Sequence, residues 1–115
     1  MEEKFNEATH LRSEGDRAMD APLVTIDLPL FIKQIKQEST WKDKDRNAIT
    51  VFKTNGMPLV LIALHAGAEM KTYSADYIIS LQVIDGRMKF SADNRSVELS
   101  TGQMLALHKG ITHRV

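Results

Sequence analysis

The chain has 115 residues, in which 15 Lys and Arg balance 15 Asp and Glu, and it has no cysteine. This length fits one domain with a single core, and the neutral charge gives no sign of a nucleic-acid partner. The lack of cysteine excludes disulfides, thiolate metal sites and a thiol nucleophile. No apolar run reaches the roughly 20 residues that span a bilayer, and the N-terminus lacks the apolar core of a secretory signal. We therefore expect a cytoplasmic protein without a membrane partner.

The first 21 residues are mildly acidic, with few apolar residues and no sustained period. We expect residues 1–21 to be a flexible arm and residues 22–115 to form a single domain. A short helix is predicted next, because Asp27 is a good N-cap and Pro29 fits the first turn. Its apolar stripe has helical spacing and consists of Leu28, Phe31, Ile32 and Ile35.

The rest of the chain alternates short apolar runs with turn signals, which is typical of strands. Asn55-Gly56 predicts a hairpin after residues 49–52, leading into the nearly continuous apolar run 58–65, which we expect to be buried on both faces. Asp85-Gly86 predicts a second hairpin between residues 77–84 and 87–92, and Asp93-Asn94 predicts another turn. Further strands are expected at 97–99, at 103–107 and from 111 onward. About eight short strands predict an all-β sandwich or barrel with one short N-terminal helix.

Two glycine-framed segments have the spacing of known motifs. The first runs from Gly67 to Gly86 as GAEMKTYSADYIISLQVIDG, and the second runs from Gly102 to His113 as GQMLALHKGITH. In this spacing the chain resembles the cupins, and it is similar to small single-domain bacterial cupins of unassigned function. The resemblance implies a double-stranded β-helix, or jelly-roll barrel. We also expect several of these glycines to have positive φ at tight turns.

The resemblance also implies a place for a metal. Metal-binding cupins hold a divalent transition metal (Fe, Mn, Ni or Zn) on two His, one Glu and a third His. The matching positions here are Tyr73, Ala75, Ile79 and His113. Only one of the four ligands remains, so no metal cofactor is expected. The alternative is a reduced site in which His108 and His65 join His113.

A ligand pocket is the function that these positions favour. If Ile79 points inward, strand alternation turns Leu81 and Val83 inward and Ser80 and Gln82 outward. The predicted pocket has an apolar wall and two polar tips, and consists of Tyr73, Ala75, Ile79, Leu81, Val83 and His113. Such a wall suits a small, partly apolar molecule, although the same residues would also serve as plain core. The identity of any catalytic residue stays open. The alternatives are a metal-dependent dioxygenase, isomerase or decarboxylase, and a sensory domain that acts through another protein.

The chain ends at Val115, shortly after His113. The family usually continues for another strand or so, which leaves two hypotheses: the chain is shortened, or a partner subunit covers the exposed edge. An unpaired edge favours association, and cupins commonly pair through their sheets, so we expect a homodimer.

Overall fold

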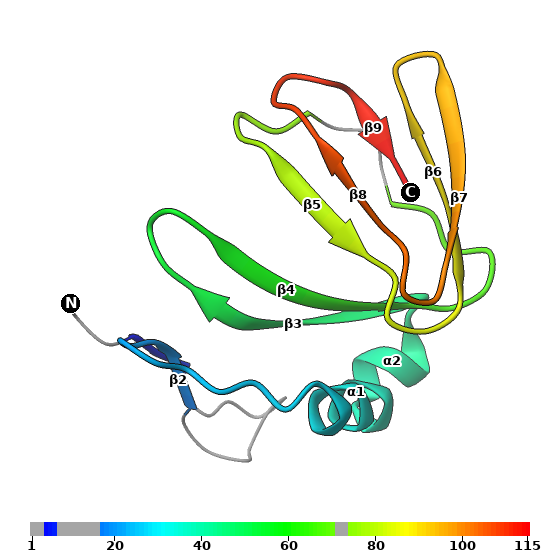
Figure 1. The fold of residues 1–115 in the computed structure, drawn as a ribbon. Coiled ribbons are helices and arrows are strands. Elements are labelled where there is room, and N and C mark those ends of the chain that lie inside the picture. The colour runs from blue at the N-terminus through cyan, green and yellow to red at the C-terminus, as the bar shows by residue number, and fades with distance from the viewer. Residues whose placement is uncertain (1–3, 7–16, 71–73) are drawn as a thin grey trace. The chain divides into compact units, whose positions relative to one another are not determined.

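The computed structural model describes residues 4–6, 17–70 and 74–115, and it is mainly β with two helices (Figure 1). The chain divides into two compact units, Met1–Ala68 and Glu69–Val115. Among the described residues, all strand pairs are antiparallel and each sheet is an open ribbon of two or three strands. The mainly β class is therefore confirmed, whereas the cupin jelly roll stays a prediction. No helix in the described ranges is long and apolar enough to span a membrane.

The first unit begins with two short strands, β1 (Lys4–Asn6) and β2 (Arg17–Asp20), which pair with each other. Both lie in the segment that we expected to be a loose arm. Their pairing uses backbone groups, so it needs no apolar period and leaves little trace in the sequence pattern. The division into an arm and one cupin domain stays a prediction.

Helix α1 (Leu28–Gln37) begins where the sequence predicts it. Oδ1 of Asp27 accepts a hydrogen bond of 3.2 Å from the backbone N–H of Leu30, which satisfies one of the unpaired donors at the helix start. A second helix, α2 (Ser39–Asp43), follows after Glu38 and was not predicted.

A ribbon of two strands, β3 (Arg46–Lys53) and β4 (Pro58–Leu64), completes the first unit. The predicted Asn55-Gly56 hairpin is confirmed, because Thr54 and Met57 exchange backbone hydrogen bonds of 3.1 and 3.3 Å. The ribbon packs with α1 in an aliphatic core of Ile35, Ile49, Val51 and Leu61.

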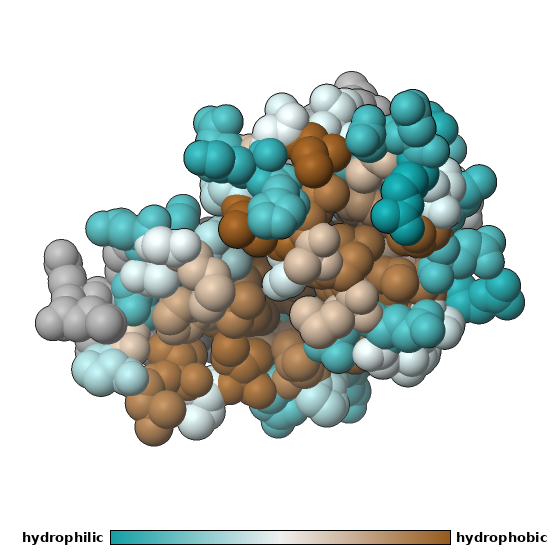
Figure 2. Space-filling model, turned by 45° about the horizontal axis from the view of Figure 1, so that its top comes forward, coloured by the Kyte–Doolittle hydropathy of each residue, from teal (hydrophilic) through white to brown (hydrophobic). Residues whose placement is uncertain are grey.

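Strand β4 is buried on one face only. Leu61 is buried, whereas Val60 and Ile62 are 48% and 42% exposed. The prediction of a strand buried on both faces is therefore wrong for β4. Its apolar run is continuous, but only one face of the ribbon contributes to the aliphatic core. Figure 2 shows apolar residues reaching the surface.

Asn47 ties the helix to this ribbon. Its buried amide donates to the backbone oxygen of Ile35 and to Oε1 of Glu38, each at 2.9 Å, and its Oδ1 accepts from Ala48 N–H at 2.9 Å. The Ile35 oxygen belongs to the last turn of α1, where carbonyls lack partners within the helix. One side chain thus supplies a missing partner and fixes the angle between α1 and β3.

The second unit contains two ribbons. Strand β5 (Ile79–Gln82) pairs with β8 (Met104–Leu107). Strand β6 (Arg87–Ala92) lies between β7 (Arg95–Ser100) and β9 (His113–Arg114). Strands β6 and β7 follow one another through the predicted turn at Asp93-Asn94.

The predicted hairpin at Asp85-Gly86 is wrong, because β5 does not pair with β6. Val83 instead continues the pairing toward β8: its N–H donates to Gln103 O at 2.9 Å, and its oxygen accepts from Gly102 N–H at 2.7 Å. Gly86 carries the chain from one sheet to the other with φ +102°, which an L side chain rarely adopts. Its N–H donates to Oγ1 of Thr101 at 3.0 Å.

Candidate functional site

The buried imidazole of His113 is the centre of the candidate site. The residue lies on β9 and is 2% exposed. Its Nδ1 lies 3.0 Å from the backbone oxygen of Ile111, so Nδ1 carries the hydrogen, because a carbonyl oxygen only accepts. The ring stacks on buried Phe90, with centroids 5.4 Å apart and planes 20° from parallel. These contacts fix both the position and the tautomer of the ring.

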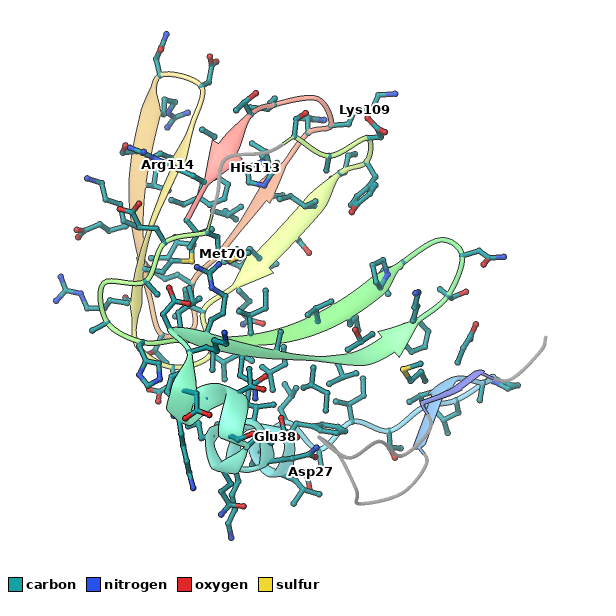
Figure 3. All side chains as sticks on the ribbon, turned by 180° about the vertical axis from the view of Figure 1, so that it is seen from behind. Asp27, Glu38, Met70, Lys109, His113 and Arg114 are labelled. Carbon is teal, nitrogen blue, oxygen red and sulfur yellow. The ribbon has the colours of Figure 1, made fainter. Side chains whose placement is uncertain are left out.

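The next residue along β9 has the opposite orientation. Arg114 is exposed where His113 is buried, as strand alternation requires, and Figure 3 labels the two side chains. On the neighbouring strand β6, Ala92 is opposite His113 and Ser91 is opposite Arg114. The sheet therefore has an inner face with Phe90 and His113, and an outer face with Ser91 and Arg114.

The ribbon of β5 and β8 also has one apolar face. Ile79 and Leu81 are half-buried and Val83 is 7% exposed, whereas Ser80 and Gln82 are exposed. This is the alternation that the sequence predicts. The residues of β8 opposite Ile79 and Leu81 are the half-buried Leu107 and Leu105. Four aliphatic side chains thus share this face without being fully covered.

Two further predicted pocket residues have different outcomes. Ala75 is half-buried and its backbone oxygen accepts a 2.8 Å hydrogen bond from Gly110 N–H, which joins the segments of the two glycine motifs. Gly110 has φ +78°, as expected for a tight turn. Tyr73 lies outside the described residues.

The residues at the metal-ligand positions do not fit a cupin metal centre. Ala75 and Ile79 carry no donor atom, and His108 is exposed just beyond β8. Within residues 4–6, 17–70 and 74–115, no three His, Asp or Glu side chains are grouped as a metal ion would require. Among the described residues at these positions, His113 is therefore the one that carries a donor atom.

His65 makes structural contacts in the first unit. Its ring stacks on Trp41, with centroids 3.5 Å apart and planes 13° from parallel. Its Nε2 lies 2.8 Å from the backbone oxygen of Trp41, and its backbone N–H donates to Asp45 O at 2.9 Å. His65 thus holds the end of β4 against the segment that follows α2.

The same segment carries an exposed ion pair. Asp45 accepts two hydrogen bonds from the Arg46 guanidinium, at 3.0 and 3.2 Å. This guanidinium lowers the pKa of the Asp45 carboxyl, and the carboxyl raises the pKa of Arg46. Both groups are solvated, so we assign the pair a local structural role.

Sequence reasoning missed a surface hollow at one end of the β7-β6-β9 sheet. Its volume is about 350 Å³, and its lining comes from the turn between β6 and β7 and from β9. The lining residues with polar side chains include Ser91, Asn94, Arg95, Ser96, Thr112 and Arg114. No spacing in the sequence reveals this group, because only the pairing of three strands brings it together.

Comparisons with known proteins found no similar protein. The chain matches no protein-family model, no curated protein and no solved structure. The likeness to cupins therefore rests on features of the sequence, chiefly the spacing of the two glycine motifs.

Proposed function

We propose that the second unit binds a small, partly apolar molecule against the apolar inner face that carries His113, without a cupin-type metal centre. The observation that carries this proposal is the fixed, buried imidazole in a unit that also has half-buried aliphatic side chains on β5 and β8. Small-molecule sites combine a mostly apolar lining with a few placed polar groups.

His113 has a specific task in this proposal. Because Nδ1–H is held by Ile111 O, the acceptor atom of the neutral ring is Nε2. A ligand with a hydroxyl or N–H group beside an apolar body complements that atom. Ile79 and Leu81, with their partners on β8, supply apolar contact for the body of the ligand.

Phenol is a suitable probe because it has an apolar ring and one O–H donor, and benzene is its matched control without a donor. We expect saturable phenol-induced shifts in the methyl NMR signals of Ile79, Leu81, Leu105 and Leu107. Benzene should bind about tenfold more weakly, since it has no O–H to donate to Nε2. His113→Phe should remove the preference for phenol, whereas His108→Phe, at an exposed position, should keep it. Shifts confined to Val60 and Ile62 in the first unit would contradict the proposal.

The proposal includes the cupin fold, a cytoplasmic location and a homodimer. Metal analysis of protein purified without a chelator or a His-tag checks the metal-free part: stoichiometric, tightly bound Fe, Mn, Ni or Zn would overturn it. Light scattering at micromolar concentration checks the dimer, and a mass of one chain alone would rule it out.

A further inference from the structure

We infer that the outer face of the β7-β6-β9 sheet holds a binding site for a small oxyanion, at the hollow beside the turn between β6 and β7. Its central residues lie on the face of the sheet opposite the proposed ligand pocket, although the inner-face residues Ala92 and His113 also line the hollow.

Strand register places the central residues in one row. Ser91 on β6 is opposite Ser96 on β7 and opposite Arg114 on β9. Residues opposite each other in an antiparallel pair lie on the same face, with Cα atoms about 4.5–5.5 Å apart. A guanidinium and two hydroxyls therefore share one face across three neighbouring strands, and all three residues line the hollow.

Side chains in this row have hydrogen-bond donors that can bind a ligand. The Oγ atoms of Ser91 and Ser96 lie 3.0 Å apart, so one hydroxyl donates to the other and the second hydroxyl keeps its hydrogen for another acceptor. In the part of the chain that the structure describes, Arg114 makes no side-chain hydrogen bond or ion pair. Its planar group of N–H donors matches two oxygens of a carboxylate, phosphate or sulfate.

The charge of this face favours an anion. Its charged residues are Arg87, Lys89, Glu98 and Arg114, which is three cations against one carboxylate. Glu98 is already engaged by Arg87, whose Nη2 lies 3.8 Å from a carboxylate oxygen, and it is opposite Lys89 in the register. Around the turn, Arg95 also lines the hollow and offsets Asp93.

The size and openness of the site set the class of ligand. A hollow of about 350 Å³ accepts a phosphate or a small carboxylate together with its water. Because the site is open to solvent, we expect inorganic phosphate alone to bind with a Kd in the millimolar range.

The test is a titration of the full chain with sodium phosphate, followed by amide NMR, with sodium chloride at equal ionic strength as the reference. We expect saturable shifts at Ser91, Ser96 and Arg114 that chloride does not produce. Sulfate and acetate titrations distinguish a tetrahedral from a planar anion: comparable affinities indicate a general oxyanion site, and a preference for phosphate and sulfate assigns it to tetrahedral anions.

Matched variants on the same sheet separate a site from general attraction. Arg114→Gln should weaken phosphate binding about tenfold, because it removes the charged donor. Ser96→Ala should weaken it less, and Arg87→Gln should leave it within about twofold, since Arg87 lies outside the hollow. Equal weakening by the two arginine variants would overturn the inference, and so would phosphate shifts no larger than those with chloride.

Discussion

The cores of the two units contain different kinds of side chain. In the first unit, the buried cluster around Ile35 and Ile49 is aliphatic, and a helix covers one face of a two-stranded ribbon. In the second, the most buried of the described side chains are Val83, Phe90 and the imidazole of His113. An aliphatic core gains its stability from packing alone, whereas a buried imidazole costs stability unless its polar atoms are satisfied. The first unit also buries polar side chains, Asp20 and Asn47, but its packed cluster is purely aliphatic, whereas the second unit stacks the imidazole of His113 on Phe90 within its core.

The largest effect is expected from breaking the aliphatic core. Ile49 is 1% exposed, so Ile49→Ala leaves a cavity in the first unit and should cost about 3 kcal/mol in the free energy of unfolding. Urea denaturation measures the loss. Val97→Ala, at a residue 37% exposed in the second unit, is the control and should cost less than about 1 kcal/mol. Equal losses would contradict the assignment of Ile49 to a packed core.

The second test replaces the polar ring. His113→Phe keeps an aromatic ring beside Phe90 but removes the donor that Ile111 O accepts from, so we expect a loss of about 1.5 kcal/mol. Residue-resolved amide exchange should show the loss in β6 and β9. If His113→Phe were instead stabilising, the ring would be ordinary core and the comparison between the units would lose its main support.

Two glycines give a smaller effect with an internal control. An ideal Cβ would meet no atom within 4 Å at either Gly56 or Gly86, but only Gly86 has positive φ. Gly86→Ala should therefore destabilise by about 1 kcal/mol, whereas Gly56→Ala should be neutral or slightly stabilising. Thermal melts of the two variants check this. A similar cost at both positions would show that backbone conformation is not the cause.

The smallest effect belongs to the exposed pair of Asp45 and Arg46. Arg46 lowers the pKa of Asp45 below its ordinary value of 3.8, so the contribution of the pair is fully present above that pH. It is lost as the pH falls through the lowered value. Urea midpoints of Asp45→Asn and the wild type, measured from pH 5 to pH 2, should differ slightly at pH 5 and converge at the acid end. A difference that grows on acidification would reverse the sign that we assign.

Local signals account for the parts of the fold that the sequence predicts. The cap at Asp27, the Asn55-Gly56 hairpin and the alternation along β5 each depend on a few neighbouring residues, and each is confirmed. The same is true of positive φ at Gly86, Gly102 and Gly110, and Gly67, for which no such prediction was made, also has positive φ.

The features that the sequence does not predict depend on which strands, far apart in the chain, pair with each other. Asp85-Gly86 has the composition of a hairpin turn, but β5 pairs with β8, which is more than twenty residues away, and this choice depends on the packing of whole strands. The candidate site likewise has one part that the sequence predicts and one part that it does not. The inner-face position of His113 follows from a motif, whereas the row of Ser91, Ser96 and Arg114 exists only once three strands are in register.

The stacked pair of Trp41 and His65 has an optical consequence. Trp41 is the only tryptophan of the chain and lies in the first unit, whereas both tyrosines, at positions 73 and 77, belong to the second. Indole emission excited near 295 nm therefore reports on the first unit alone, and the tyrosine band of the near-ultraviolet circular dichroism spectrum reports on the second. The stacked His65 ring, with its centroid 3.5 Å from that of the indole, is part of the indole's surroundings in the folded first unit, so the emission changes when this contact is lost. Unmodified protein thus carries a separate spectroscopic label in each unit, and two unfolding curves that fail to coincide would show that the units melt independently.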